Sequence, residues 1–185
     1  IGVSILGNYD SAGEAFRQSF FMVSSTITST GFATADTGEW GNFPQTLLLL
    51  LMFVGACAGS TGGGMKVSRI LIIVKTGIRE LKYIVSPRAV ATVKLDGKPV
   101  EKDIIRGASN YFILFMLIYA FSILLLSFDS YTLEENISAV TTCMNNIGFG
   151  VGRLDTSGNF SEYSVFSKLV LCFDMLIGRL EIYPL

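Results

Sequence analysis

The sequence predicts an all-α integral membrane fold, in which helices that cross the membrane alternate with short helices that enter it only part way. Of the 185 residues, 50% are hydrophobic and 14 are phenylalanine, and the mean hydropathy of +0.53 is far above that of a soluble domain. The 14 basic residues are segregated, because ten of them lie between Lys66 and Arg106, together with only four acidic residues. The positive-inside rule assigns this stretch, residues 66–106, to the cytosol.

Composition also limits the classes of function. The net charge is -1, so no overall field suggests nucleic acid as a partner. The sequence has no histidine and no evident pair of nucleophile and base, so we expect neither an enzyme nor a covalent cofactor. The three cysteines, Cys57, Cys143 and Cys172, lack the spacing of metal ligands or of a disulfide framework, and we interpret them as packing residues.

The first expected element is a half-helix over residues 12–27. Ser11 and Glu14 have the spacing of a capping box, and about 16 helical residues rise only about 24 Å. A similar box, Thr132 with Glu135, opens a second short helix that ends at about Met144. Spanning helices are expected over residues 43–58, 104–128 and 160–182, each near the roughly 20 residues that a bilayer requires.

Each half-helix runs into a polar stretch that contains Gly-Phe. These stretches are SSTITSTGFATAD and TTCMNNIGFGVG. Gly31 and Gly148 are 117 residues apart (148 minus 31), and Gly41-Asn42-Phe43 recurs at the same offset as Gly158-Asn159-Phe160. The repeated unit is a half-helix, a Gly-Phe turn and a spanning helix. Because the first unit has no helix before it, we expect the chain to begin inside a repeat and to be a fragment.

The two Gly-Phe turns have the chemistry of an ion filter. Non-helical backbone within a membrane is tolerated only where it lines water or is buried in protein. Each half-helix points its negative C-terminal end at the turn, and glycine lets successive carbonyls face one axis. The alternative is that TSTGF and NIGF are ordinary loops outside the membrane. Their shared offset favours a filter, as does an excess of acidic residues in the segments expected on the same side of the membrane as the turns.

Three parts of the chain follow from this pattern. Asp96-Gly97 predicts a two-residue hairpin, which Pro99 limits to a short ribbon. We expect residues 1–84 to form a unit that lacks its first helix, and residues 85–102 to form a cytosolic connection with the hairpin. Residues 103–185 should form a second unit with an outer helix, a half-helix, a turn and an inner helix.

The chain resembles the Trk/Ktr/HKT superfamily of potassium transporters, most closely the Trk-type membrane subunit, in the motifs TSTGFATAD, GACAGSTGGGMKVSRI, SPRAVATVKLDGK, NNIGFGVG and MLIGRLEIYP. Members have four membrane-pore-membrane repeats with re-entrant pore half-helices, so the resemblance implies that this chain holds the third and fourth, as a C-terminal fragment. It also implies a filter formed by Thr28, Ser29, Thr30, Gly31, Asn145, Asn146, Ile147 and Gly148. The K+ ions would be held by the carbonyls of Thr30, Gly31, Ile147 and Gly148.

The run Gly59-Ser60-Thr61-Gly62-Gly63-Gly64 should break a spanning helix, because six residues of low helix propensity interrupt an apolar segment. In the family such a run is a gating loop beneath the filter, although a plain kinked helix would also fit. A nucleotide P-loop does not fit, since Met65 follows the last glycine where that motif has lysine, and no strand precedes it.

The last expected helix contains charged residues that we expect to lie near the pore. Arg179 is related to Gly62 by the offset of 117, so it should lie level with the glycine loop. The resemblance implies that Arg179 braces the loop as part of the gate, and a snorkelling arginine is the alternative. Lys168 is about three turns before Arg179 and should face the pore with it. Asp174 lies off that face, where the family leads us to expect a small apolar residue.

The resemblance implies potassium uptake across the prokaryotic cytoplasmic membrane by a multi-pass protein in the lipid bilayer. It implies a homodimer of the full-length subunit and a cytosolic ring of nucleotide-binding regulatory subunits, with no role for nucleic acid. We expect the 185-residue piece to conduct nothing alone. The alternatives are a Na+ or mixed K+/Na+ transporter of the same superfamily, a secondary carrier with broken helices, and a membrane anchor without transport.

Overall fold

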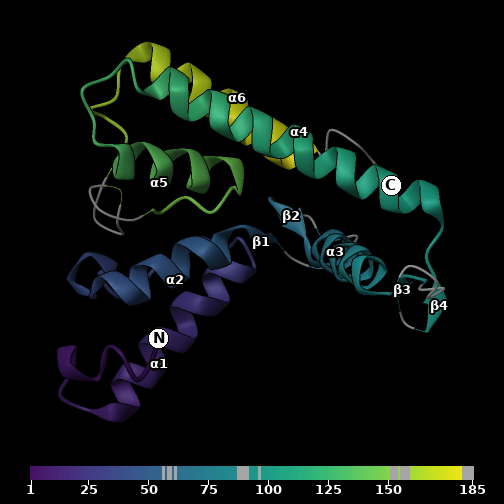
Figure 1. Ribbon diagram of the computed structural model, residues 1–185. Coiled ribbons are helices and arrows are strands. Elements are labelled where there is room, and N and C mark those ends of the chain that lie inside the picture. Colours follow the sequence, from purple (N-terminus) through teal and green to yellow (C-terminus); the bar gives the residue numbers. More distant parts are fainter. Residues whose placement is uncertain are drawn as a thin grey trace.

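The computed structural model describes residues 1–55, 57, 60, 62–86, 92–95, 97–150, 154 and 159–180, and its architecture is mostly helical (Figure 1). Among these residues, one helix is long and apolar enough to cross a membrane, and a second is apolar but has only 11 residues. The elements, in chain order, are η1 (Leu6–Asn8), α1 (Ala12–Ile27), η2 (Thr37–Glu39), α2 (Asn42–Met52), β1 (Val54–Gly55), β2 (Met65–Lys66), α3 (Val67–Val85), β3 (Lys94–Leu95), β4 (Lys98–Pro99), α4 (Lys102–Leu126), α5 (Leu133–Met144) and α6 (Val165–Leu180).

The two half-helices, α1 and α5, have the predicted extents but differ at their caps. In α5 the complete capping box forms, because Thr132 Oγ1 accepts from the Glu135 N–H and a Glu135 carboxyl oxygen accepts from the Thr132 N–H. The box expected at α1 is wrong. Ser11 Oγ accepts from the Gly13 N–H at 3.3 Å, while the Glu14 carboxylate lies 3.5 Å from Arg17.

The span expected over residues 43–58 is wrong at its C-terminal end. The helix α2 ends at Met52, and the chain then forms β1, which pairs in parallel with β2 in the register Val54 to Met65 and Gly55 to Lys66. This pairing holds the backbone extended on both sides of the glycine run, so helix resumes only at Val67. The break between α2 and α3 is therefore wider than the glycine run itself.

The inner helix α6 begins at Val165, later than the expected residue 160. Asp129, in the loop after α4, accepts from the Ser164 N–H at 3.2 Å, and Ser164 Oγ accepts from the Ser167 N–H at 3.1 Å. Ser164 thus acts as the N-terminal cap and fixes where the helix starts. The expected C-terminal end at residue 182 lies outside the described residues.

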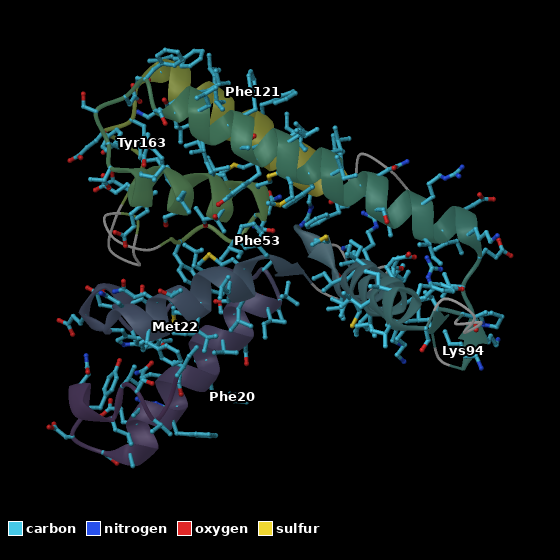
Figure 2. The ribbon with its side chains drawn as sticks, viewed as in Figure 1. Phe20, Met22, Phe53, Lys94, Phe121 and Tyr163 are labelled. Carbon is cyan, nitrogen blue, oxygen red and sulfur yellow. The ribbon has the colours of Figure 1, made fainter. Side chains whose placement is uncertain are left out.

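The long helix α4 supplies the predicted outer helix and packs against α3, α5 and α6. Its outward side chains are large and apolar, and Phe121 is 59% exposed and projects away from the bundle (Figure 2). By contrast α5 is covered on most sides, although its buried residues include Asn136, Ser138 and Thr142. An apolar outside around a polar inside is the distribution that a lipid environment favours.

The predicted hairpin forms between the two units. Lys94 pairs with Pro99 and Leu95 pairs with Lys98 in an antiparallel ribbon, and Gly97 has φ of +79°. The other turn residue, Asp96, lies outside the described residues. Figure 1 shows this ribbon next to α3, at the opposite end of the molecule from η1 and the start of α1.

Candidate functional site: two glycine turns and the loop beneath them

The first glycine turn folds directly off the C-terminal end of α1. The Ser29 N–H donates to the Thr26 carbonyl at 3.1 Å, and the Thr30 N–H donates to the Ser25 carbonyl at 3.0 Å. Ser29 and Gly31 have positive φ, 52° and 78°. Positive φ is costly for serine, and here the chain adopts it at the point where the helix must stop and turn.

The second turn repeats the same backbone bonds after α5. The Asn146 N–H donates to the Cys143 carbonyl at 3.1 Å, and the Ile147 N–H donates to the Thr142 carbonyl at 3.0 Å. Asn146 and Gly148 have φ of 54° and 109°. Each of these residues stands 117 positions after its counterpart in the first turn, so the sequence offset is accompanied by a shared backbone geometry.

Hydroxyl groups fasten both turns to their half-helices. Ser25 Oγ donates to the Phe32 carbonyl at 2.6 Å, and Thr142 Oγ1 donates to the Phe149 carbonyl, also at 2.6 Å. Thr142 Oγ1 accepts in addition from the Gly148 N–H at 3.0 Å. Sequence reasoning missed these two residues, although Ser25 and Thr142 are both hydroxyl residues at the offset of 117 and could have been found by it.

The two turns touch. A Cβ built on Gly31 would collide with the carbonyl oxygen of Ile147, so the backbones meet at a point that only glycine allows. The Ile147 and Phe149 side chains also leave their own unit and pack into the core cluster of the first, which contains Ile5, Ala15, Met22, Trp40, Leu48 and Met52. The structure thereby brings together Gly31 and Gly148, the two glycines singled out in the sequence.

The remaining predicted filter residues differ in exposure on this chain. Thr28, Thr30 and Gly148 are exposed, whereas Asn145 and Ile147 are buried. The described residues contain no group of three or more His, Cys, Asp or Glu side chains suited to a metal, at these turns or elsewhere. The C-terminal ends of α1 and α5 add a favourable potential for a cation there.

The glycine run lies directly against the second turn. A Cβ on Gly63 would come within 2.5 Å of the Asn145 carbonyl oxygen, and one on Gly64 would collide with the Asn145 side chain. Gly64 also has φ of +76°. Of the predicted gate residues, Gly59 and Thr61 lie outside the described residues, and Ser60, Gly62, Gly63 and Gly64 are all non-helical.

Lys66, which directly follows this run and Met65, is buried and turns back into it. Its Nζ donates to the carbonyls of Ser60 and Gly62 at 2.5 and 2.8 Å. The excess of basic residues over residues 66–106 did not predict that Lys66 is buried, because the count does not distinguish one lysine from another. The position of Lys66 beside the glycine run was the available signal.

The charged residues of α6 are placed differently from one another. Gly178 lies so close to the Met144 carbonyl that a Cβ would collide with it. The following residue, Arg179, is therefore near the C-terminal end of α5. Gly63 contacts Asn145 at the same end of α5. The Arg179 side chain is exposed on this chain. Lys168 is half-buried and its Nζ donates to the Ser161 carbonyl at 2.8 Å. Asp174 is fully buried, and its partner is Ser122 on α4.

The three cysteines also differ in burial. Cys143 in α5 is buried, as expected of a packing residue, whereas Cys57 and Cys172 are exposed on this chain. All three thiols are free.

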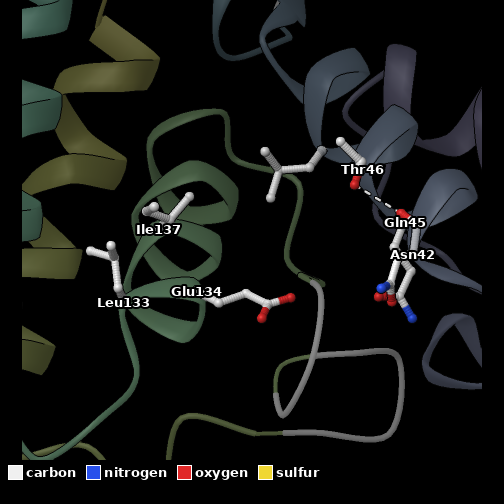
Figure 3. A pocket seen from close by; sticks show the side chains of 7 residues that line it. Asn42, Gln45, Thr46, Leu133, Glu134 and Ile137 are labelled. Carbon is white, nitrogen blue, oxygen red and sulfur yellow. Dashed lines mark hydrogen bonds between the residues drawn. The ribbon is translucent and has the colours of Figure 1, made fainter.

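A pocket of about 400 Å³ opens between the N-terminal parts of α2 and α5, at the end of α5 opposite the second glycine turn. Figure 3 shows the Glu134 carboxylate entering it from α5, with Asn42 and Gln45 on the α2 side. Thr46 is held against its own helix by a 2.8 Å bond to the Asn42 carbonyl. The polar groups of the pocket thus come from both units.

Comparison with known proteins gives consistent matches over nearly the whole chain. The family model TrkH, described as a cation transport protein, matches residues 2–185. The chain is 38% identical over 179 residues to the Trk system potassium uptake protein TrkG of Escherichia coli K12, a match that covers 97% of this chain and 36% of the relative. It is 39% identical over 178 residues to the Trk system potassium uptake protein TrkH of Vibrio parahaemolyticus, covering 96% and 36%.

The fold matches a solved structure equally well. The crystal structure of the potassium transporter TrkH from Vibrio parahaemolyticus superposes with a TM-score of 0.90 at 38% sequence identity, covering 98% of this chain and 39% of that one. The chain therefore spans little more than a third of the length of the relatives that it matches.

Proposed function

The chain belongs to the TrkH family of cation transport proteins, and on that premise we propose that it is the C-terminal part of a transporter that takes up potassium across the prokaryotic cytoplasmic membrane. Residues 1–84 and 103–185 would be the third and fourth of four membrane-pore-membrane repeats, joined by a cytosolic connection over residues 85–102. The complete protein would conduct K+ down its electrochemical gradient, without a covalent cofactor.

One observation carries this proposal. Two glycine turns, each at the end of a half-helix, have the same pattern of backbone hydrogen bonds, and they touch at Gly31 and Ile147. We infer that the carbonyls of Thr30, Gly31, Ile147 and Gly148 supply half of a filter in which they replace the hydration shell of K+. Two further residues complete each turn. They are Thr28 and Ser29 in the first turn and Asn145 and Asn146 in the second. Two further turns would come from the rest of the protein.

The glycine run would be the gate of this pore. Gly63 and Gly64 support this role because they contact Asn145 at the start of the second turn, so a movement of the loop would displace that residue. Arg179 would brace the loop from α6, since Gly178 contacts the same end of α5. Lys168, higher on α6, would face the pore.

The partners follow from the same family reading. The basic hairpin, in which Lys94 and Lys98 are exposed, would contact a cytosolic ring of nucleotide-binding subunits, and the complete subunit would form a homodimer. Reversing both charges, as Lys94→Glu with Lys98→Glu, should then weaken regulation by nucleotide while leaving unregulated flux intact. Regulation that survives the double reversal would remove the hairpin from the interface.

The filter assignment is tested by ion selectivity in liposomes that contain the complete transporter. Gly148→Ser should lower the ratio of K+ to Na+ flux, because φ of +109° strains any residue with a Cβ and displaces the carbonyls on either side. Gly77→Ser is the matched control, since a Cβ at that helical position meets no atom within 4 Å. A wild-type protein that prefers Na+, or a Gly148→Ser variant with unchanged selectivity, would contradict the proposal.

A further inference from the structure

Lys66 stands where a cation is doubly unfavourable. It is the N-cap residue of α3, at the positive end of the helix dipole, and its side chain makes no capping bond. It is also only 3% exposed, so its ammonium group has lost most of its hydration. A buried charge in a membrane protein requires compensating contacts and is presumed to have a function.

The compensation comes from the glycine run. Lys66 Nζ lies 2.5 Å from the Ser60 carbonyl and 2.8 Å from the Gly62 carbonyl, with Ser60 Oγ at 3.5 Å. The Gly62 N–H in turn donates to Ser60 Oγ at 3.3 Å. The ammonium group is therefore held by backbone carbonyls, the same kind of ligand that would hold a dehydrated K+ ion.

Described residues near this contact also meet other parts of the chain. Gly55, on β1, lies close to the Gly63 carbonyl and is paired with Lys66 itself in the parallel ribbon. Gly63 and Gly64 lie in close contact with Asn145 at the start of the second glycine turn. The tie between Lys66 and Ser60 thus closes a segment that contains Gly63 and Gly64, the two residues in contact with the second turn.

We propose that Lys66 is a tethered cation that locks the glycine loop in its closed position by occupying carbonyls that would otherwise be free to turn toward a permeating ion. This inference rests on the proposed function, because it assumes that the loop gates a pore. It assigns to Lys66 a positioning role, exerted through Ser60 and Gly62, and distinguishes it from the other lysines of residues 66–106.

The test is K+ flux through the complete transporter in liposomes. Lys66→Met keeps the apolar stem and removes the charge, and it should raise basal flux about tenfold or more, because the lock consists of hydrogen bonds to a charged group. Lys66→Arg keeps donors for both carbonyls and should restore flux toward the wild-type value. Lys75→Met is the matched control, since Lys75 also donates to a backbone carbonyl, that of Lys94, but lies on the exposed face of α3.

A second measurement follows the loop without relying on flux. Cys57 is a native free thiol two residues before the glycine run, and its carbonyl accepts from the Ser60 N–H at 3.1 Å. Thiol labelling of the complete transporter, read by peptide mapping, should modify Cys57 faster in Lys66→Met than in wild type and at the wild-type rate in Lys66→Arg. Faster labelling supports the lock whatever the transported ion.

The outcomes separate the two proposals. If Lys66→Met reaches the membrane at the wild-type level with unchanged flux and unchanged Cys57 labelling, the lock is refuted, while a loss of selectivity in Gly148→Ser would leave the filter standing. Lowered flux in Lys66→Met, not corrected by Lys66→Arg, also refutes it, because a lock must release when removed. If no variant conducts K+ but labelling accelerates as expected, the loop tie stands and the proposed function fails.

Discussion

Ser122 on α4 donates a hydrogen bond of 2.7 Å from its hydroxyl to Oδ1 of Asp174 on α6, and both side chains are buried. The second carboxyl oxygen of Asp174 has no hydrogen-bond partner within the described part of the chain. Asp174 was the residue of α6 whose partner the sequence left open. The structure makes it a polar link between the outer and inner helices of the second unit.

This link should be measurable as a coupling energy between the two side chains. Hydrogen bonds between membrane helices contribute about 0.6–2 kcal/mol, so a double-mutant cycle of Ser122→Ala and Asp174→Ala should give an interaction of that size in the free energy of unfolding. Asp174→Asn keeps an acceptor for the Ser122 hydroxyl and should retain most of the stability.

Ser127→Ala is the control for the cycle. Ser127 Oγ donates to the Ile123 carbonyl of its own helix at 2.8 Å, so it should not couple to Asp174. Chemical or thermal unfolding of the complete protein in detergent provides the measurement. A coupling indistinguishable from zero for Ser122 and Asp174 would show that the contact is not formed in solution.

Thr142 should be the more critical of the two hydroxyl residues that hold the glycine turns. Thr142→Val leaves the Phe149 carbonyl without its buried bond, which costs about 1–3 kcal/mol, and it also removes the acceptor of the partly buried Gly148 N–H. The ratio of K+ to Na+ flux should therefore fall. Thr142→Ser keeps the hydroxyl and should preserve the ratio, and Ser25→Ala, which removes one bond, should have a smaller effect. Equal ratios in the valine and serine variants would contradict this role.

The elements that could be predicted from the sequence are those with local signals or with a counterpart in the internal repeat. The bounds of α1 and the start of α5 follow from polar caps and from the polar turns after them, and the hairpin follows from Asp96-Gly97. The Gly-Phe turns were found because their residues recur at a fixed offset. The caps and the hairpin turn lie within a few residues of the features that they predict, whereas the Gly-Phe turns required a comparison of two segments 117 residues apart.

The features that escaped prediction depend on contacts between distant segments. The early end of α2 depends on pairing between Val54–Gly55 and Met65–Lys66, which no periodicity within either segment reveals. The later start of α6 depends on Asp129, which reaches Ser164 from the preceding loop. The burial of Lys66 and the partner of Asp174 also depend on tertiary contacts. A charged residue in an apolar segment indicates that a partner exists but does not identify it.

The capping box of α5 should contribute more stability than the simpler cap of α1. Thr132→Ala removes the acceptor for the Glu135 N–H and should cost about 1 kcal/mol. Ser11→Ala likewise removes one contact of 3.3 Å, to the Gly13 N–H, but no reciprocal side-chain bond supports that contact, so the loss should be smaller. Glu135→Gln keeps an oxygen for the Thr132 N–H and serves as the control for charge. A loss for Ser11→Ala as large as that for Thr132→Ala would mean that the reciprocal bond of the capping box adds no stability.

Two helical glycines should respond in opposite directions to the same substitution. Gly77 lies within α3 and an added Cβ meets nothing within 4 Å, so Gly77→Ala should stabilise the protein by about 0.5–1 kcal/mol, the difference in helix propensity. Gly178 lies within α6 against the Met144 carbonyl, where a Cβ would collide with the backbone of α5.

For Gly178→Ala the collision outweighs the gain in propensity, because overpacking of a close contact typically costs about 1–3 kcal/mol. We therefore expect the unfolding midpoint of the complete protein in detergent to rise for Gly77→Ala and to fall for Gly178→Ala. The displacement of α6 should also reach Asn146, whose Nδ2 donates to the Met175 carbonyl at 3.2 Å, and lower the K+ to Na+ flux ratio. A Gly178→Ala protein as stable and selective as wild type would mean that α6 is not packed this closely against the second glycine turn.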